Sequence, residues 1–475
     1  MNYFHNLFRT AWLLTVVLFT ACNDGDHQTS VSPKKPNILF ILADDLGYGD
    51  LTCFGSHEIE TPNLDALAST GIQLRNFYAS SAVCTPSRAA ILSGKYPIRF
   101  DIRHHFRDET DENLPAEISS MAWMLKKGGY FTAHIGKWHL GGIQEHEFNA
   151  RAHGDDSVDP GPMQHGFDHY LCFIEDTVRK ELFSKKRLYR DGGLHLVRNE
   201  RRIPPVSGHW TDIKTDETIF LIDSLSRAGQ PFFINLWYDV PHTPYEPAPA
   251  PHTEKYKARG FTGNKLLYNA MVSHMDAGIG RIVKRLKGLG ELDNTLIVFT
   301  SDNGPAYFGS TGYFSGGKAD LHEGGIRVPF IAAWPGNISS GVINTNVVAS
   351  NVDLLPTFCK AAGVDYDGSL YDGENILPWL TGAEKAPPRR EIFWQLDFYS
   401  FYPQPGDKPK PYATTALLKG SYKLLADSLE PVELFDLADD PSEMKNKVDE
   451  FTDIRDSLAI RIQKYLSDPR IVESE

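Results

Sequence analysis

Short apolar runs that end abruptly in polar residues recur along this chain. In the first, residues 38–42 read Ile-Leu-Phe-Ile-Leu, and Ala43-Asp44-Asp45 follows directly. An apolar run without alternation is typical of a parallel strand that is buried on both faces. Residues 131–135, 232–237 and 295–300 show the same pattern, so we expect buried strands there too.

Amphipathic segments separate these runs. The apolar residues of 265–286 recur at helical spacing and predict a long helix with one buried face. We expect shorter helices at 61–69, 120–127 and 353–361. Residues 143–215 are rich in glycine, proline, histidine and charge, and we expect them to be mostly loop. Buried strands alternating with helices predict an α/β fold, with a large mixed, mostly parallel sheet sandwiched by helices.

The C-terminal region has a different pattern. We therefore predict a catalytic domain over 36–380 and a smaller C-terminal α+β subdomain over 381–475, built from an antiparallel sheet plus a helix. Its predicted strands and closing helix are 391–396, 413–419, 422–426 and 452–466.

The N-terminus is predicted to direct export. Residues 1–22 combine the charge of Arg9 with an apolar stretch too short to span a bilayer, as in a signal peptide. The sequence Leu-Phe-Thr-Ala-Cys22 resembles a bacterial lipobox, so we expect lipid on Cys22, with simple cleavage as the alternative. Residues 23–35 would then be a flexible tether. We predict a periplasmic or cell-surface lipoprotein of a Gram-negative bacterium that contacts membrane only through this anchor.

Composition narrows the class of partner. The chain has 475 residues, 41% of them hydrophobic, and a formal net charge of −13. An acidic chain is a poor partner for nucleic acid, which we exclude, and an anionic substrate would need a locally positive pocket. The five cysteines do not form a disulfide scaffold, because Cys22 and Cys84 have other predicted roles and leave at most one disulfide.

Oxygen-bearing side chains follow two of the predicted strands. Asp44 and Asp45 come after the first strand, and Asp302 and Asn303 come after the strand at 295–300. These oxygens suit a hard cation, so we predict a Ca²⁺ site, with Mg²⁺ less favoured. Either pair alone could simply cap a loop, but two pairs at strand ends favour a metal. The absence of histidine from this set argues against a two-zinc site.

Lysine and histidine follow the other strands. Lys137 and His139 lie in Gly-Lys-Trp-His-Leu-Gly after the second strand, and in extended geometry both would point to one side. His242 follows the third strand, between prolines, and Lys318 lies on a glycine loop. Each could be an ordinary loop residue, but together they indicate a site at the carboxyl edge of the sheet.

The stretch Cys84-Thr-Pro-Ser-Arg88 adds a candidate reactive group. Thr85 is a good N-cap and Pro86 fits a first helical turn, so Cys84 is predicted just ahead of a helix N-terminus, where anions are favoured. Arg88, one turn later, would point back to the same place. From these residues alone, a free cysteine with a low pKa is one interpretation.

In order and type, these motifs resemble those of the type I sulfatases of the alkaline phosphatase superfamily. The motifs are Asp-Asp at 44–45, Cys-x-Pro-Ser-Arg at 84–88, Gly-Lys-x-His at 136–139, Pro-His at 241–242, Ser-Asp-Asn-Gly at 301–304 and Gly-Gly-Lys at 316–318. The resemblance covers residues 36–440. It implies a sulfuric ester hydrolase whose cysteine is oxidised to formylglycine by a maturase, which would be a partner of this chain.

The resemblance also implies a role for each residue. The implied cation ligands are Asp44, Asp45, Asp302, Asn303 and the modified Cys84. The hydrated formylglycine would attack sulfur, His242 would protonate the leaving oxygen, and Lys318 would bridge that oxygen and the sulfate. Lys137 and Arg88 would hold the diol and the sulfate oxygens. His139 would deprotonate the second hydroxyl so that sulfate is expelled.

An exported sulfatase of this kind is expected to act on sulfated carbohydrate, such as host or algal glycosaminoglycan or mucin chains, with galactose-type sugars favoured. Sugar contacts are expected from polar residues near the predicted helix and near Lys318, although these could instead be solvated loop residues. The candidates are Arg103, His104, His105, Arg107, Asp320 and His322. The alternatives are a phosphonate or phosphate monoester hydrolase of the same superfamily and a catalytically dead glycan-binding lipoprotein.

Overall fold

The computed structural model describes most of the chain between residues 34 and 468. The described residues are 34–106, 112–143, 159–173, 196–204, 206, 208–385, 390–397 and 413–468. The predicted signal peptide with Cys22, nearly all of the tether, and Arg107 lie outside them. From Lys35 onward the chain groups as one compact unit. Within the described ranges, no helix has the length and apolar character needed to cross a membrane.

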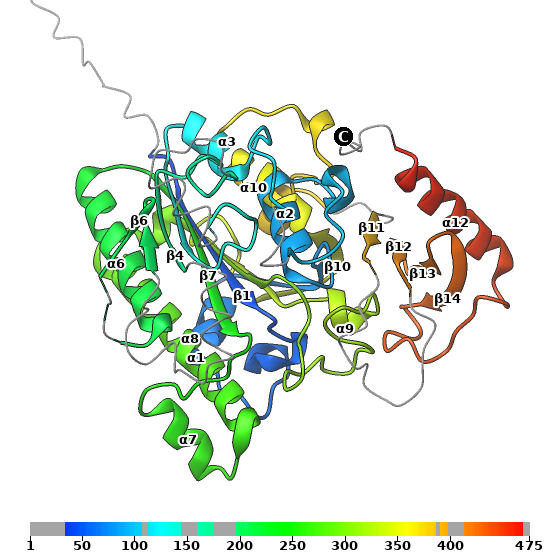
Figure 1. Cartoon of the computed structure of the whole chain (residues 1–475), viewed down its shortest axis with the longest axis horizontal. Coiled ribbons are helices and arrows are strands. Elements are labelled where there is room, and N and C mark those ends of the chain that lie inside the picture. Colours follow the sequence, from blue (N-terminus) through cyan, green and yellow to red (C-terminus); the bar gives the residue numbers. More distant parts are fainter. Residues whose placement is uncertain are drawn as a thin grey trace, which may run out of the picture. The chain divides into compact units, whose positions relative to one another are not determined.

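A ten-stranded sheet runs through this unit in the order β10-β2-β9-β8-β1-β7-β3-β4-β5-β6 (Figure 1). Its strands are β1 (Asn37–Asp44), β2 (Ile72–Tyr78), β3 (Phe131–Gly136), β4 (His169–Phe173), β5 (Leu196–Arg198), β6 (Arg201–Arg202), β7 (Phe232–Pro241), β8 (Thr295–Ser301), β9 (Phe330–Ala333) and β10 (Val342–Ser350). The central strands β8, β1, β7, β3 and β4 are parallel, whereas β9, β5 and β6 pair antiparallel with their neighbours. The predicted mixed, mostly parallel sheet is confirmed.

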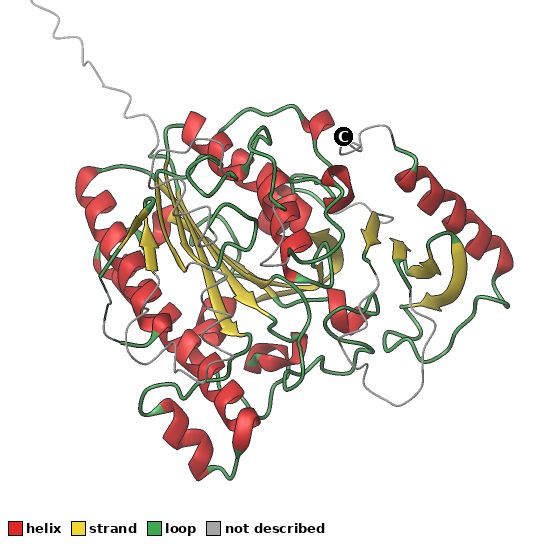
Figure 2. Cartoon of the chain, in the orientation of Figure 1, coloured by secondary structure: helices red, strands yellow, loops and turns green. Residues whose placement is uncertain are grey.

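Helices cover both faces of this sheet (Figure 2). The α-helices in the described part of the chain are α1 (Pro62–Ser69), α2 (Cys84–Ser93), α3 (Met121–Lys127), α6 (Trp210–Ala228), α7 (His252–Ala258), α8 (Gly263–Gly288), α9 (Glu323–Ile326), α10 (Leu354–Ala361), α11 (Leu377–Thr381) and α12 (Thr452–Leu466). One face of the sheet shares a hydrophobic core with α2, α3 and α10, and the other shares a second core with α1, α6 and α8.

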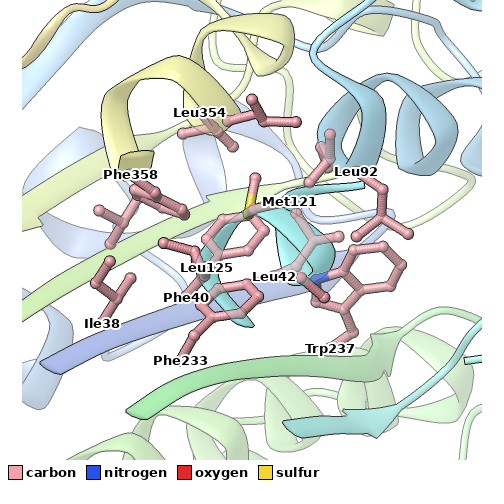
Figure 3. Close-up of a cluster of buried hydrophobic side chains, with 14 of the residues drawn as sticks. Ile38, Phe40, Leu42, Leu92, Met121, Leu125, Phe233, Trp237, Leu354 and Phe358 are labelled. Atoms are coloured by element: carbon pink, nitrogen blue, oxygen red, sulfur yellow. The ribbon is translucent and has the colours of Figure 1, made fainter. Parts of the chain in front are cut away.

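Strand β1 shows why an apolar run without alternation is needed. Phe40 packs with α3 and α10, and its ring lies 5.8 Å from that of Phe358 (Figure 3). Leu39 and Ile41 belong to the core on the opposite face. Because successive side chains of a strand point to opposite faces, a strand between two helical layers must be apolar on both.

The four central strands end side by side. β1 pairs in parallel with β8, with Ala43 opposite Ser301, and also with β7. β7 pairs in parallel with β3, with Trp237 opposite Gly136. Parallel neighbours finish at the same edge of a sheet, so the polar residues that follow these strands meet there.

A second sheet, antiparallel and in the order β11-β12-β13-β14, lies in the C-terminal region. Its strands are β11 (Glu391–Gln395), β12 (Thr415–Lys419), β13 (Tyr422–Asp427) and β14 (Glu430–Asp436). Helix α12 packs on this sheet, as predicted. The core between them also includes Tyr78, Val83 and Leu321, which belong to the larger part of the chain. The C-terminal subdomain therefore shares its core with the segments around Cys84 and Lys318.

Several elements were not predicted from the sequence. β10 is an edge strand in which only Val347, Ala349 and Ser350 are buried, so it lacks a clear apolar run, and β14, α7, α9 and α11 were not predicted either. β4, β5 and β6 lie inside the segment 143–215 that was expected to be mostly loop, and α6 begins there. No disulfide joins the four cysteines within the described ranges.

Candidate active site

Four oxygen-bearing residues meet where β1 and β8 end. Asp45 follows β1 in the left-handed conformation, with φ of 62°, which turns the chain out of the sheet. Its N–H donates to Asp302 Oδ1 at 3.1 Å, and its Oδ1 accepts from Asn303 Nδ2 at 2.7 Å. Asp44, the last residue of β1, is buried with them. The sequence-predicted cation ligands from these two strands thus form one cluster.

Cys84 is the first residue of α2. Val83 is the N-cap, in extended conformation and without a side-chain hydrogen bond. The prediction that Thr85 caps the helix and that Cys84 precedes it was wrong. The Thr85 hydroxyl instead donates to His139 O at 3.0 Å and accepts from the Phe106 N–H at 3.2 Å, so it ties α2 to the loop after β3. Cys84 still lies in the first turn, where free N–H groups favour an anion.

Two lysines converge on the sulfur of Cys84. Lys318 Nζ lies 3.5 Å and Lys137 Nζ 3.7 Å from Sγ. Each ammonium also contacts a carboxylate at 2.8 Å, Lys137 with Asp44 Oδ2 and Lys318 with Asp45 Oδ2. Segments far apart in the sequence therefore surround Cys84 with fixed charges.

The Cys84 thiol is not suited to act as a free nucleophile. Only 2% of the residue is exposed, and burial raises the pKa of its thiol to about 12 in spite of the nearby lysines. Such a thiol keeps its proton at neutral pH, whereas the thiolate is the reactive form. The interpretation of Cys84 as a low-pKa free cysteine is not supported by these surroundings.

Arg88 neutralises carboxylates without reaching solvent. Its Nε and Nη2 donate to Asp302 Oδ2 at 3.0 and 2.7 Å, and its Nη1 donates to Lys137 O at 3.0 Å. Nη2 also lies 3.3 Å from Asp44 Oδ1. Burial opposes the charge on Asp44, but Lys137 and the other cations around it hold the pKa of that carboxyl well below its usual range. Burial raises the pKa of Asp302, on which neighbouring carboxylates also act.

The donor set fits a hard cation. Asn303 Oδ1 is buried and, among the described residues, has no hydrogen-bond partner, although its Nδ2 is bonded to Asp45. A buried amide oxygen is normally satisfied, so an unpaired one beside three carboxylates fits a metal ligand. The residues whose ligand atoms lie within 4.8 Å of one another are Asp44, Asp45, Cys84 and His242. Asp302 and Asn303 adjoin this group through their hydrogen bonds to Asp45.

Two histidines complete the cluster. His242 Nδ1 lies 2.6 Å from Thr243 O, which can only accept, so Nε2 faces the cluster at 3.7 Å from Asp45 Oδ2. Burial and the charge of Lys137 lower the pKa of His242 to about 4. The same causes hold the pKa of His139 well below its usual range. His139 has φ of 56°, so the segment is not extended as predicted, although Trp138 is fully buried as expected.

The predicted sugar-binding cluster after α2 divides into separate environments. Arg103 pairs with Asp101 near the surface. His104 Nε2 lies 2.8 Å from Glu112 Oε1, and its Nδ1 lies 3.3 Å from Asp397 Oδ2 in the C-terminal region. His105 is half-buried, and its ring centroid lies 6.4 Å from that of His139. Of the three, His105 lies beside a predicted catalytic residue.

His322 has a different environment from the one expected for a sugar contact. Its ring is buried, with Nδ1 2.5 Å from Asp320 Oδ1 and Nε2 2.7 Å from Glu433 Oε2. Both ring nitrogens are thus engaged by carboxylates, and neither is available to a sugar hydroxyl. We therefore no longer expect His322 to bind a sugar, whereas Asp320, which uses Oδ1 in this contact, stays a predicted sugar contact.

A buried ion pair near the site was not predicted. Lys214 of α6 pairs with Asp239 of β7, three residues before His242. Burial lowers the pKa of Lys214 to about 8. No sequence pattern marks this lysine, because it lies in the segment expected to be loop and reaches β7 only through the packing of α6.

Comparison with known proteins gives a family for the whole described chain. Residues 36–364 match the family model Sulfatase, and residues 309–468 match the model N-sulphoglucosamine sulphohydrolase, C-terminal. Arylsulfatase A from Bos taurus is 32% identical over 93% of this chain and 88% of its own length. N-acetylgalactosamine-6-sulfatase from Homo sapiens is 34% identical over 74% of this chain and 67% of its own. The solved structure of Ps i-CgsB in complex with k-i-k-neocarrahexaose is similar, with a TM-score of 0.77 at 27% identity, covering 91% of this chain and 93% of its own.

Proposed function

Since this chain belongs to the type I sulfatases of the alkaline phosphatase superfamily and is a sulfuric ester hydrolase, we propose that it removes sulfate from a carbohydrate by means of formylglycine made from Cys84 and a bound Ca²⁺. We propose galactose-type sugars as the substrate class. The support is that one relative is named N-acetylgalactosamine-6-sulfatase, while one structural neighbour is in complex with k-i-k-neocarrahexaose.

The observation that carries this proposal is the balance of charge around residue 84. Three cations, Arg88, Lys137 and Lys318, contact three carboxylates, Asp44, Asp45 and Asp302. Their charges sum to about zero, and the neighbouring histidines are neutral. A divalent cation would therefore leave the site with a net charge of about +2. Such a pocket attracts an anionic sulfate ester even though the whole chain is acidic.

Asp44, Asp45, Asp302 and Asn303 would hold the cation through oxygen. A hard cation there would withdraw charge from the reacting oxygens, and formylglycine would supply the nucleophile at position 84. The chain's own lysines would bind the sulfate oxygens, because Lys137 Nζ and Lys318 Nζ lie 3.7 and 3.5 Å from the sulfur at that position. Arg88, whose guanidinium contacts protein groups, would orient Asp302 and Asp44.

Two histidines would move protons. His242 presents Nε2 to the cluster and would hold the proton for the leaving oxygen, since an anionic sulfate bound beside it raises the pKa of the ring. His139 is neutral and half-buried next to the first turn of α2, where it would accept a proton as a base. His105, beside His139, is our candidate for a sugar contact.

We also propose export of the chain with lipid on Cys22, and oxidation of Cys84 by a formylglycine-generating maturase. The supports are the N-terminal sequence and the match of Cys84-Thr-Pro-Ser-Arg88 to the family motif. Labelling with a radioactive fatty acid in a bacterial host tests the first. Loss of label in Cys22→Ala is the expected result, and a labelled variant would contradict it.

The test of function is sulfate release from a panel of singly sulfated galactose, N-acetylgalactosamine and glucosamine saccharides. The protein is first checked by peptide mass for oxidation of Cys84. We expect release from one galactose-type isomer and none from Cys84→Ala. Release of phosphonate from an aryl phosphonate monoester, with all sulfates inert, would favour the phosphonate alternative. Sugar binding without any turnover in oxidised protein would favour the dead glycan-binding alternative.

A further inference from the structure

The loop that carries Lys318 is tied to the nucleophile segment. Residues 315–322 belong to no helix or strand. The Lys318 N–H donates to Pro305 O and the Ala319 N–H donates to Ala82 O, each at 2.9 Å. Ala82 lies two residues before Cys84. These backbone hydrogen bonds hold the loop against Pro305 and Ala82, but they do not hold the side of the loop that faces α9.

Helix α9 holds that other side by direct backbone contact. A Cβ added at Gly325 would lie 1.9 Å from Asp320 O and 2.3 Å from Gly317 O. A Cβ at Gly324 would lie 2.5 Å from Ser315 O. With no side chains between them, the loop has no space to move toward α9. The position of α9 therefore determines the position of the loop, and with it the position of Lys318.

A buried lysine of the C-terminal sheet fixes the first residue of α9. Lys423 Nζ, on β13, lies 2.9 Å from Glu323 Oε1 and 2.7 Å from Glu443 Oε1. Glu443 Oε2 in turn accepts from the Glu323 N–H at 2.7 Å. Tyr78 Oη and Arg327 Nη1 donate to Glu323 Oε2, both at 3.0 Å. We call Lys423, Glu323 and Glu443 the Lys423 clasp.

Two further bonds join the C-terminal region to the same loop. Ser315 Oγ donates to Ser442 O at 2.6 Å, and His322 Nε2 lies 2.7 Å from Glu433 Oε2 on β14. The loop is thus held near both of its ends by residues from beyond position 430. The side chain of Lys423 is completely buried, and an ammonium in such a place is costly unless it is fully paired. One of its carboxylate partners, Glu323, is the first residue of α9, and the other, Glu443, accepts from the Glu323 N–H.

We propose that Lys423 is a positioning residue for catalysis: through Glu323 and Glu443 it fixes α9, and α9 fixes the loop that presents Lys318. This inference rests on the proposed role of Lys318 at the leaving oxygen. It makes the C-terminal subdomain a part of the catalytic apparatus, although none of the three clasp residues contacts Cys84 in the described structure.

The test compares aryl sulfates, from 4-nitrophenyl to 4-methylphenyl sulfate, in full-length protein carrying Lys423→Met. Lys318 would neutralise charge on the leaving oxygen, which matters more when the leaving phenol is a weaker acid. A misplacement of about 1 Å costs up to about a hundredfold in rate. We expect kcat for 4-methylphenyl sulfate to fall roughly tenfold more than kcat for 4-nitrophenyl sulfate. Lys318→Ala should show the same pattern, and adding Lys423→Met to it should change the pattern no further.

Arg390→Met is the matched control. Arg390 is also buried and pairs with Asp353, and its hydrogen bonds go to that residue and to Val348 O. It should lose stability while keeping the wild-type dependence on the leaving group. Equal losses on all sulfates in Lys423→Met would overturn the proposal and leave Lys423 a purely structural residue.

A milder variant keeps the test open if Lys423→Met does not fold. Glu443→Gln removes one charge from the Lys423 clasp with little change of shape, and it should shift the leaving-group pattern in the same direction by a smaller factor. An unchanged pattern in a folded Glu443→Gln protein would overturn the proposal. If Lys318→Ala itself leaves the pattern unchanged, the role of Lys318 in the proposed function fails first, and the inference about Lys423 falls with it.

Discussion

Arg88 shows how tightly single residues are specified at this site. Its guanidinium contacts Asp302, Asp44 and the backbone carbonyl of Lys137 at once, and it is fully buried. Lysine cannot reproduce this, because a single ammonium lacks the planar fork of donors.

We expect Arg88→Lys to lose both stability and metal. Lysine keeps the charge but leaves buried carboxylate oxygens without donors, and each unsatisfied group costs about 1–3 kcal/mol, so the free energy of unfolding in urea should fall by a few kcal/mol. Bound calcium, measured by elemental analysis, should fall below one equivalent because Asp302 is no longer held in place. Arg455→Lys, on the surface beside Asp456, should change neither quantity. Full calcium content in Arg88→Lys would argue against Asp302 as a ligand.

His322 should make stability depend on pH. Although burial opposes its charge, Asp320 and Glu433 raise the pKa of His322 to about 10. A histidine whose pKa is about 6.5 in the unfolded chain then contributes stability that is complete below about pH 6.5. That contribution is lost as the pH rises toward 10. The difference in unfolding free energy between wild type and His322→Gln should be a few kcal/mol at pH 6 and should vanish near pH 10.

Urea denaturation at pH 6, 8 and 10 measures this difference directly. His57→Gln provides the exposed control, which should match wild type at every pH. A His322→Gln deficit that stays constant across the three pH values would show that the ring acts through packing alone.

Some site residues could be predicted because they follow a strand directly, whereas Cys84, Arg88 and Lys318 were predicted from their sequence motifs. Asp44, Lys137 and Asp302 were found because an apolar run marks where each strand ends and parallel strands share an edge. Lys214 and Lys423 could not be found in this way. Their importance depends on which buried carboxylate each one reaches, and sequence spacing does not contain that information.

At the scale of elements, the close contact between α9 and the loop that carries Lys318 depends on two glycines, Gly324 and Gly325. Gly325→Ala would place a Cβ 1.9 Å from Asp320 O, so the loop must shift. We expect kcat for sulfate release to fall by about tenfold or more and stability to fall by about 1–3 kcal/mol. Gly288→Ala, at the end of α8 with open space around it, is the matched control and should keep wild-type kcat. An active Gly325→Ala protein would mean that the loop position is not set by α9.

Elements were predictable where the sequence carries a clear apolar pattern. β1 and α8 carry unbroken apolar patterns, and their predicted bounds lie within about two residues of the observed ones. The predicted bounds of α12 agree with the structure. β10 could not be recognised because its early residues face solvent, and α6 was missed because charged and threonine residues interrupt its apolar face. Tertiary packing, rather than local sequence, defines those two.

On the scale of the whole molecule, we expect the two sheets to unfold together, because they share a core. Trp394 of β11 donates its indole N–H to Ala79 O, and it packs with residues beside Cys84. We expect the fluorescence of Trp394 and of Trp237, each isolated by difference with its Phe variant, to report one urea midpoint.

Calcium at a thousand times its dissociation constant should raise the unfolding free energy by about 4 kcal/mol, and EDTA should reverse this. An earlier transition at Trp394, insensitive to calcium, would show that the C-terminal subdomain unfolds separately.

The burial of Cys84 also bears on when the enzyme becomes active. Every residue of α2 is buried, so a modifying enzyme that must bind the chain around Cys84 could do so only before the chain has folded. Oxidation and folding would then compete for each newly made chain. A chain that folds first would keep its thiol and remain inactive for as long as it stays folded. The active fraction of a preparation would be settled during synthesis, and slowing the folding of the chain would increase the yield of working enzyme.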